Sequence, residues 1–184
     1  MSKIIILDYG IGNIGSVRNA FKFLNYEVKI IKNHQDFLNE KSYLGFILPG
    51  VGAFPQGILK LRQSGLNETI QELIKNNIPG IGICLGMQLL ANCSEEGGIE
   101  TEGLSLFNGT VRKLDSNTEK IPHIGWSKTE ANIRTEKWRK CLDGVFYYVH
   151  SYAVRLKEST EEAAFFTHGG EKYLAAIYKS NLLK

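Results

Sequence analysis

Ile78-Pro-Gly-Ile-Gly-Ile-Cys-Leu-Gly-Met-Gln-Leu-Leu-Ala91 is the stretch from which both the fold and the chemistry of this chain are inferred. It begins with a short apolar run, residues 81–83, of the kind that forms a buried parallel strand. It ends with Met87-Gln-Leu-Leu-Ala91, whose residues favour a helix. Between them lies Gly82-Ile-Cys-Leu-Gly86, a G-x-C-x-G pattern typical of a nucleophile elbow. The stretch therefore predicts a strand, a sharp turn that presents Cys84, and a helix.

The two glycines of this pattern allow the strand and the helix to approach closely around the turn. We expect the Cys84 sulfur to lie at the helix N-terminus, where N–H groups and the helix dipole favour the reactive thiolate. An ordinary buried core cysteine is the alternative interpretation. The flanking glycines, strand and helix favour a nucleophile.

The composition of the chain limits its possible classes. Its 184 residues suit one domain with a substantial core, and 43% hydrophobic with 22% charged residues is ordinary for a globular protein. A net charge of +3 with scattered basic residues argues against a nucleic-acid partner. We find no signal peptide and no apolar run near the ~18 residues of a membrane span. Three cysteines without a framework spacing predict reduced thiols in a cytoplasmic protein.

The first half of the chain alternates between strand and helix patterns. Strands are expected at residues 3–7, 27–31 and 45–48, and helices at residues 16–24, 56–63 and 67–76. Gly10-Ile-Gly-Asn-Ile-Gly15 matches the dinucleotide pattern G-x-G-x-x-G, but the second strand runs into Lys32-Asn-His34 without a carboxylate to hold a ribose. A strand-to-helix turn with Ser16 near the N-cap is favoured over nucleotide binding.

Pro49-Gly-Val-Gly52 follows the strand at residues 45–48. Open parallel sheets bind ligands at the carboxyl ends of their strands. The backbone N–H groups of such a loop could stabilise a developing negative charge, as in an oxyanion hole. A simple strand-exit turn is the alternative.

The second half is rich in β patterns. We expect a polar loop at residues 92–103 and a hairpin turn at His168-Gly-Gly170. Strands are expected at residues 104–111, 124–131, 145–154, 163–167 and 173–178. The plan is one α/β domain over residues 1–184, with a β-rich second half.

A thiol that attacks an amide also needs a general acid and base, because ammonia must leave protonated. Of the four histidines, His34 and His168 are expected in exposed polar segments. His123 and His150 lie at strand ends beside aromatic residues, and the residues alone favour His150 as the base.

Five motifs in the same order resemble those of the class I glutamine amidotransferases, and among them the glutaminase subunits of imidazole glycerol phosphate synthase. They are Asp8-Tyr-Gly-Ile-Gly-Asn13 with Ser16-Val-Arg-Asn-Ala20, Pro49-Gly-Val-Gly-Ala-Phe54, Gly82-Ile-Cys-Leu-Gly-Met-Gln88, Pro122-His-Ile-Gly-Trp126 and Val149-His-Ser-Tyr152. The resemblance implies a flavodoxin-like, mixed but mostly parallel sheet flanked by helices, and no metal or organic cofactor.

The resemblance also assigns residues to roles. It implies that Cys84 is the nucleophile and that the substrate's α-amino and α-carboxylate groups are held by Gln88, His150, Ser151 and Tyr152. The oxyanion site would comprise Gly50, Val51, Gly52 and the N–H of Leu85. Asn13 and Trp126 would face a partner subunit.

The family's base comes from a Gln-Phe-His-Pro-Glu motif after the last strand, and this motif does not occur in the sequence. We expect a fragment that lacks the end of its last strand and a C-terminal helix. A naturally short, inactive homologue that serves as a binding module is one alternative, and recruitment of another base is a second.

The expected function is hydrolysis of glutamine to glutamate and ammonia through a Cys84 thioester. The resemblance implies that the ammonia passes to a barrel cyclase subunit in histidine biosynthesis. Alternatives are a paralogous subunit that supplies ammonia for sugar modification in surface polysaccharide synthesis, and a non-catalytic binding subunit.

Overall fold

The apolar run at the start of the chain forms the first strand, β1 (Lys3–Leu7), which is paired on both sides within a parallel sheet. Every side chain from Ile4 to Leu7 is apolar and buried, because both faces of a parallel strand are covered. The computed structural model describes residues 3–115, 119–157, 162–179 and 182–183. Its contacts divide the chain into two compact units, one comprising residues 3–90 with 182–183 and the other residues 91–179.

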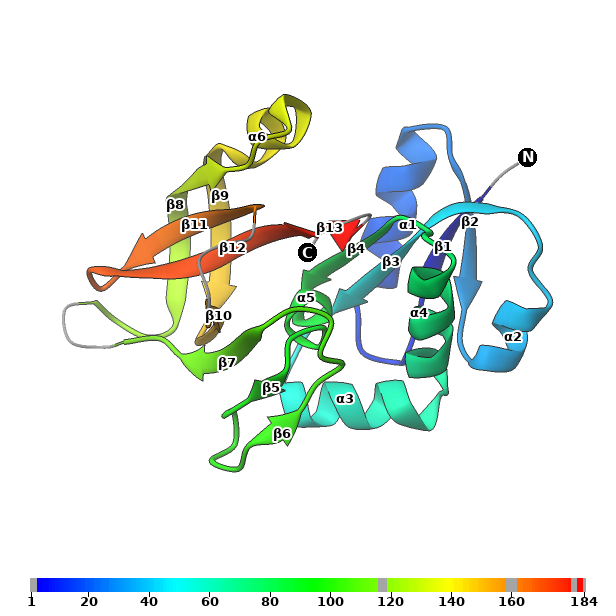
Figure 1. Ribbon diagram of the computed structural model, residues 1–184, viewed down its shortest axis with the longest axis horizontal. Coiled ribbons are helices and arrows are strands. Elements are labelled where there is room, and N and C mark those ends of the chain that lie inside the picture. Colours follow the sequence, from blue (N-terminus) through cyan, green and yellow to red (C-terminus); the bar gives the residue numbers. More distant parts are fainter. Residues whose placement is uncertain (1–2, 116–118, 158–161, 180–181, 184) are drawn as a thin grey trace. The chain divides into compact units, whose positions relative to one another are not determined.

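The first unit contains five parallel strands in the order β2-β1-β3-β4-β13. The strands other than β1 are β2 (Glu27–Ile31), β3 (Tyr43–Gly50), β4 (Gly80–Cys84) and β13 (Leu182–Leu183). The helices are α1 (Ile14–Phe23), α2 (His34–Leu38), α3 (Phe54–Gln63), α4 (Leu66–Lys75) and α5 (Leu85–Gln88). This alternation confirms the predicted parallel α/β arrangement (Figure 1).

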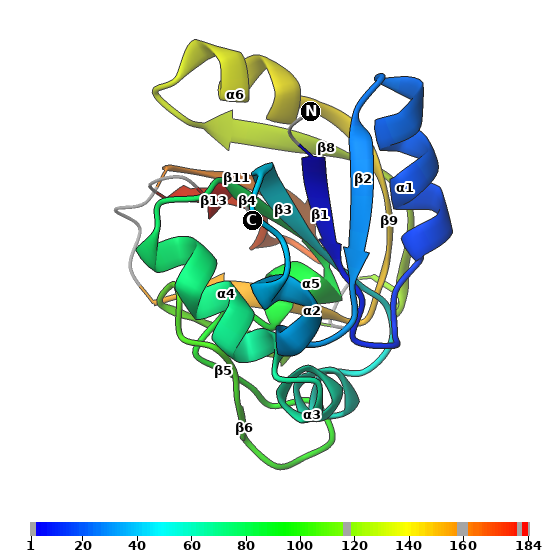
Figure 2. The same cartoon turned by 90° about the vertical axis from the view of Figure 1, so that its right-hand side faces the viewer.

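Helices lie on both faces of this sheet. Val17 and Phe21 of α1 pack against the cluster of Ile4, Ile6 and Ile47. Helix α4 contacts both α2 and α3, and these three helices lie away from α1 (Figure 2). The sheet is therefore covered on both faces, which leaves the carboxyl ends of its strands as the place for a site.

The second unit is built from β-strands in two groups. One has the antiparallel order β12-β11-β8-β9, and the other has the order β10-β7-β5-β6. The strands are β5 (Cys93–Ser94), β6 (Thr101–Glu102), β7 (Gly109–Lys113), β8 (His123–Asn132), β9 (Gly144–His150), β10 (Tyr152–Leu156), β11 (Glu162–His168) and β12 (Glu171–Lys179). Helix α6 (Glu136–Leu142) joins β8 to β9. The predicted β-rich second half is confirmed, and Gly169 and Gly170 form the two-residue hairpin turn between β11 and β12.

Several predicted boundaries are wrong. The strand expected at residues 145–154 is two strands, because the chain leaves β9 at Ser151 and β10 pairs with β7 instead. The strand expected at residues 104–111 begins only at Gly109, and the loop expected at residues 92–103 contains the short strands β5 and β6. These differences reflect strand pairing between distant segments, which the alternation of one segment does not encode.

The start of α1 also differs from the prediction. Asn13, not Ser16, is its N-cap, and the Asn13 side chain accepts a hydrogen bond from the Ser16 backbone N–H. The face predicted for burial is only partly covered, because Ala20 is exposed and Leu24 is 59% exposed.

The helix after the elbow is a single turn, Leu85–Gln88, rather than the predicted Met87–Ala91. Beyond it, the chain bonds elsewhere: the Ala91 carbonyl accepts from the Ser105 N–H, and the Asn92 N–H donates to the Gly109 carbonyl. These bonds draw the backbone away from helical geometry.

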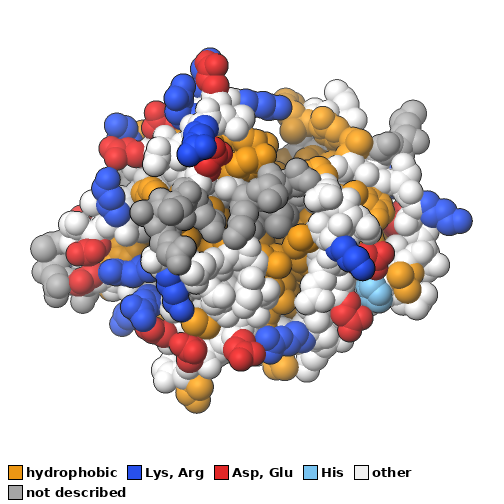
Figure 3. Space-filling model, viewed as in Figure 1, with side chains coloured by type: hydrophobic (Ala, Val, Ile, Leu, Met, Phe, Trp, Pro, Cys, Tyr) orange, Lys and Arg blue, Asp and Glu red, His pale blue; other side chains and the backbone are white. Residues whose placement is uncertain are grey.

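The surface carries charges of both signs. Figure 3 shows Lys and Arg side chains interspersed with Asp and Glu side chains over the described part of one face. That face therefore offers mixed rather than uniformly basic chemistry.

Candidate active site

Cys84 is the last residue of β4 and the residue directly before α5. Its backbone has φ 55° and ψ −117°, a conformation that residues other than glycine rarely adopt. Such strain costs about 1–3 kcal/mol and is characteristic of a nucleophile elbow. The side chain is exposed. The predicted strand, turn and exposed thiol are confirmed, and the interpretation of Cys84 as an ordinary core cysteine is wrong.

The glycines on either side of Cys84 are required by close approach. A methyl group on Gly82 would lie 2.9 Å from the Met87 Cα and 3.0 Å from the Gly86 carbonyl oxygen. A methyl group on Gly86 would overlap the Leu48 carbonyl oxygen of the neighbouring strand. Glycine is thus required at both positions of the G-x-C-x-G pattern, because α5 lies in close contact with β3 and β4 there.

The loop predicted to form an oxyanion site begins beside the elbow. Gly50 is the last residue of β3 and is paired with Cys84 in the parallel ladder, so that it lies in the strand and not in the loop as predicted. Val51 follows with 52% exposure, and Gly52 has φ 96°, which favours glycine. The structure therefore brings Gly50 and Cys84 together at the carboxyl ends of two adjacent strands. The oxyanion role of this loop remains a prediction.

The electrostatics of Cys84 differ from the expectation. Cys84 is an exposed residue, yet burial of its thiol among protein atoms raises the pKa of that thiol above its usual value. A backbone hydrogen bond from Leu85 lowers that pKa, but by less. The single turn of α5 has too little aligned backbone for the expected helix dipole to reverse this balance. The thiol is therefore the resting form, and attack on an amide requires a base.

Three side chains of the second unit form a hydrogen-bonded chain that we call the histidine relay. His123 Nε2 lies 2.9 Å from Ser127 Oγ, and His123 Nδ1 lies 3.2 Å from His150 Nε2. His150 Nδ1 lies 3.0 Å from the Tyr152 carbonyl oxygen. Because that carbonyl only accepts, His150 Nδ1 carries the hydrogen, His123 Nδ1 donates to His150 Nε2, and Ser127 donates to His123 Nε2.

The relay carries no charge at neutral pH. Burial, together with the neighbouring histidines, lowers the pKa of His123 and of His150. Both ring nitrogens of His150 are engaged, one by His123 and one by the Tyr152 carbonyl. The arrangement fixes the turn at Ser151, between β9 and β10, and leaves His150 poorly suited to act as a general base.

Comparison with known proteins identifies the family. A model of the family described as glutamine amidotransferase class-I matches residues 5–182. The chain belongs to the class I glutamine amidotransferases. This is the family that the five sequence motifs, including the one around Cys84, resembled.

Curated relatives within the class I glutamine amidotransferases are HisH subunits of imidazole glycerol phosphate synthase. The one from Caldanaerobacter subterraneus subsp. tengcongensis is 42% identical over 96% of this chain and 85% of its own length. The one from Listeria innocua is 41% identical over 81% of this chain and 70% of its own length. In the chloroplastic imidazole glycerol phosphate synthase hisHF of Arabidopsis thaliana, 34% identity extends over 98% of this chain and 30% of that protein.

Solved structures of glutamine amidotransferases share the fold. A glutamine amidotransferase from Thermotoga maritima aligns with a TM-score of 0.67 and 18% identity, over 99% of this chain and 73% of that one. PurLQS from the same organism aligns with a TM-score of 0.70 and 13% identity, over 99% and 84%. At these identities the likeness supports the class I amidotransferase fold alone.

The remaining predicted site residues lie in both units of the amidotransferase chain. Gln88 ends α5 and is half-buried, and Leu85 begins that helix next to Cys84. Asn13 is exposed, with its side chain engaged in capping α1. Trp126 is 72% exposed on β8. The substrate and partner roles of these residues, and of His150, Ser151 and Tyr152, remain predictions.

Two histidines are placed differently from the prediction. His34 is not in a solvated loop: it begins α2, and its Nδ1 lies 2.9 Å from Thr69 Oγ1. His168 is not exposed: it is only 3% exposed, and its Nδ1 lies 2.9 Å from a Glu119 carboxylate oxygen. The hairpin turn is at the surface, but the side chain before it points inward and packs on the His123 ring.

Over the described residues, no group of three or more His, Cys, Asp and Glu side chains is arranged to hold a metal ion. In the same part of the chain, no helix has both the length and the apolar character needed to cross a membrane.

Proposed function

We propose that this chain is the glutaminase subunit of imidazole glycerol phosphate synthase, which releases ammonia from glutamine for histidine biosynthesis. The observation that carries the proposal is the strained, exposed Cys84 beside Gly50, in a sequence 42% identical to a HisH subunit. We also propose a cytoplasmic location, where the three free cysteines would remain reduced.

The chemistry follows from the position of the thiol. Cys84 gives its proton to a base while its sulfur attacks the side-chain amide carbon of glutamine, and the carbonyl oxygen becomes an oxyanion. The backbone N–H groups of Val51 and Leu85, at the ends of β3 and β4, are the proposed donors to that oxyanion. The C–N bond then breaks, the nitrogen takes a proton and leaves as ammonia, and water hydrolyses the thioester to glutamate.

The raised pKa of Cys84 gives this chemistry a measurable property. The family's His-Pro-Glu motif does not occur in these 184 residues. For a protein consisting of these residues alone, we expect the rate of Cys84 alkylation by iodoacetamide to rise steeply only above the usual thiol range, near pH 8.5. The measurement uses a Cys93→Ser, Cys141→Ser background, with Cys84→Ala as the blank. Full reactivity at neutral pH would contradict the resting thiol.

The partner proposal is supported by an exposed apolar surface on β8 and β9. In the register of these strands Ile124 pairs with Val149 and Trp126 with Tyr147. These four side chains point to the same face of the ribbon and are between 55% and 72% exposed. The Trp126 and Tyr147 rings lie 5.4 Å apart in an edge-to-face contact. Exposed aromatic clusters of this kind are typical of protein interfaces.

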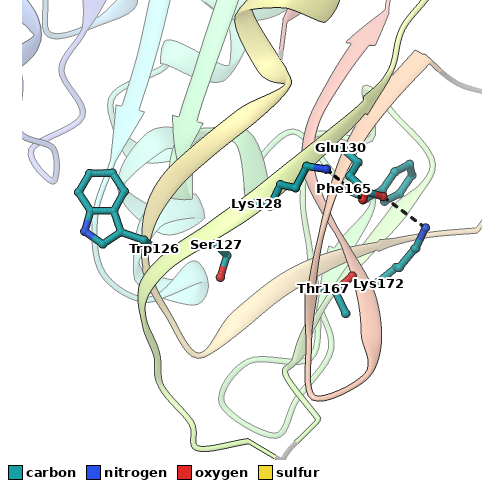
Figure 4. Close-up of a pocket in the computed structure, with 7 residues that line it drawn as sticks. All are labelled: Trp126, Ser127, Lys128, Glu130, Phe165, Thr167 and Lys172. Carbon is teal, nitrogen blue, oxygen red and sulfur yellow. Dashed lines mark ion pairs between the residues drawn. The ribbon is translucent and has the colours of Figure 1, made fainter.

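Beside Trp126 the same strand borders a polar hollow of about 420 Å³ (Figure 4). Within it the Glu130 carboxylate lies 3.8 Å from the Lys128 ammonium and 3.9 Å from the Lys172 ammonium. Contacts this long and exposed contribute little stability, so the charged groups can exchange partners. An apolar centre bordered by adjustable charges is the usual composition of a transient interface.

The partner surface is tested by Trp126→Ala, with binding to the cyclase subunit measured by calorimetry. If Trp126 is an anchor of the interface, we expect Kd to rise by about 30-fold, equivalent to about 2 kcal/mol. Phe23→Ala is the control, because Phe23 is also an exposed aromatic residue, 86% exposed on α1. Equal effects of the two substitutions would argue against a specific surface on β8 and β9.

The activity is tested with Cys84→Ala in the complex with the cyclase. Glutamine-dependent synthesis of imidazole glycerol phosphate should be abolished, whereas synthesis from added ammonia should continue. Loss of both activities would contradict the assigned role of Cys84. Glutamate release by the protein with its natural ends should also rise when the cyclase is added, and equal rates with and without it would argue against partner control.

A further inference from the structure

Tyr9 has a buried hydroxyl group that no predicted role explains. The residue follows β1, and its side chain is 4% exposed. Among the described residues, no hydrogen-bond partner lies within reach of the Tyr9 hydroxyl. A buried hydroxyl without a partner is costly, because it has lost its bonds to water without replacing them. Such a group needs a reason for its retention.

The Tyr9 hydroxyl lies directly against the proposed oxyanion loop. A methyl group on Gly50 would overlap the Tyr9 oxygen, and it would lie 2.8 Å from the Gly86 backbone nitrogen. Gly50 therefore contacts both Tyr9 and the elbow. Gly50 is also paired with Cys84 in the parallel ladder between β3 and β4, so the hydroxyl that contacts Gly50 lies next to the elbow. The unpartnered hydroxyl is thus part of the nucleophile's surroundings.

The hydroxyl is a permanent donor. Burial is the main cause that raises the pKa of Tyr9 above its usual value, and the Cys84 charge adds to it. The phenol therefore keeps its proton over the whole physiological range. It can donate one hydrogen bond to a carbonyl oxygen or an oxyanion that comes within reach.

The adjoining backbone can supply such an acceptor. Gly50 and Gly52 flank Val51, and Gly52 already has a positive φ of 96°. Rotation of the Gly50–Val51 peptide, which glycine permits, turns the Val51 N–H and the Gly50 carbonyl in opposite directions. When the N–H faces the substrate oxyanion, the carbonyl of the same peptide must face away from the substrate, and the Tyr9 hydroxyl already contacts Gly50.

We propose that Tyr9 is a positioning residue of the glutaminase site, whose hydroxyl donates to the Gly50 carbonyl when the Gly50–Val51 peptide presents its N–H to the oxyanion. The inference rests on the proposed glutaminase function. The Tyr9 hydroxyl then has no hydrogen bond while the loop is in the orientation of this structure, and it gains one when the Val51 N–H faces the oxyanion.

The test is Tyr9→Phe, which removes only the hydroxyl. Because this group has no bond to lose in the resting protein, Tm should stay the same or rise. Because the bond forms as the oxyanion develops, kcat for cyclase-stimulated glutamine hydrolysis should fall by about tenfold or more, with KM for glutamine little changed. Synthesis from added ammonia, which bypasses this site, should be unchanged.

Tyr173→Phe is the matched control. Tyr173 is also fully buried, but its hydroxyl accepts hydrogen bonds from the Asp115 N–H at 2.7 Å and from Arg155 at 3.2 Å. Its loss should lower Tm and leave kcat unchanged, the opposite of the result for Tyr9→Phe.

Three results would overturn the inference. A lower Tm with normal kcat for Tyr9→Phe would show that the hydroxyl is already bonded, for example to a buried water. A fall in both would indicate a structural role, and no change in kcat with an unchanged Tm would indicate no role. Absence of glutamine hydrolysis by the wild-type complex would instead contradict the proposed function, and the inference with it.

Discussion

The elbow around Cys84 and the histidine relay around His123 both lie at strand ends, but they are held by different interactions. The elbow is held by backbone contacts, since Gly82 and Gly86 allow α5 to press on β3 and β4. The relay is held by side-chain hydrogen bonds between strands, with His123 and His150 separated by 27 positions in the chain. A site held by close backbone packing leaves a local glycine pattern, whereas a site held by side-chain bonds leaves no such pattern.

The largest effect is expected for Gly86→Ala, which disturbs the backbone packing of the elbow. The added methyl group would overlap the Leu48 carbonyl oxygen, which is backbone and cannot move aside cheaply. We expect a loss of about 3 kcal/mol or more in the free energy of unfolding and no glutaminase activity. Urea titration measures the first quantity.

Gly15→Ala is the control for that measurement. Gly15 lies within α1, and a methyl group there would have no neighbour within 4 Å. Alanine should stabilise this helix by about 0.5–1 kcal/mol, because glycine loses more backbone freedom on folding. If both variants lost the same stability, backbone crowding would not explain the elbow.

The relay is broken by His123→Ala, which leaves the Ser127 hydroxyl and His150 Nε2 without their partner. Since two hydrogen bonds are lost in a buried place, we expect a loss of about 2–3 kcal/mol in the free energy of unfolding. His34→Ala, at a half-buried residue with a single hydrogen bond to Thr69, should cost about 1 kcal/mol by the same measurement. Equal losses of stability in the two variants would mean that the relay contributes no more to stability than a single ordinary hydrogen bond.

A smaller effect of opposite sign is expected at Cys84 itself. Cys84→Gly relieves the backbone strain at φ 55° and should raise the free energy of unfolding by about 1 kcal/mol, although activity is lost. Cys84→Ala removes the thiol but keeps the strain, so it should show no such gain. Equal stabilities of these two variants would indicate that the elbow is unstrained.

The pH dependence of stability should be the smallest effect near neutral pH. The pKa values of His123 and His150 are lowered by burial and by the nearby His168, although Glu119 opposes this for His123. As the pH falls below about 6.5, these histidines bind protons in the unfolded chain more readily than in the folded relay, so the free energy of unfolding decreases. Between about pH 7.5 and 8.5 these groups should contribute no change, and His123→Ala should flatten the acidic slope. An unchanged slope in that variant would exclude His123 as a source.

Much of the first unit could be predicted because its signals are local. The apolar run after Lys3 predicted a strand at residues 3–7, and a second strand was predicted at residues 27–31; both have the bounds found in β1 and β2. The G-x-C-x-G spacing predicted the turn at Cys84, because each glycine lies where backbone only a few residues away or on the next strand leaves no room for a side chain.

The errors have a common physical cause. The break at Ser151, the burial of His168 and the bond from His34 to Thr69 all depend on segments that are distant in the sequence. The raised pKa of Cys84 depends on how tightly the surrounding chain excludes water. A role for Tyr9 could not be predicted from the sequence, since nothing local distinguishes a hydroxyl without a partner from one that has a partner.

The sequence by itself determined the parallel α/β plan, the family and the sharp turn at Cys84, because these depend on short-range patterning and on glycines at contact points. Only the tertiary structure decided the charge state of the thiol, the tautomers of the histidine relay and the position of the Tyr9 hydroxyl against Gly50. Those properties arise from solvent exclusion and hydrogen-bond geometry, which exist only after distant segments have packed together.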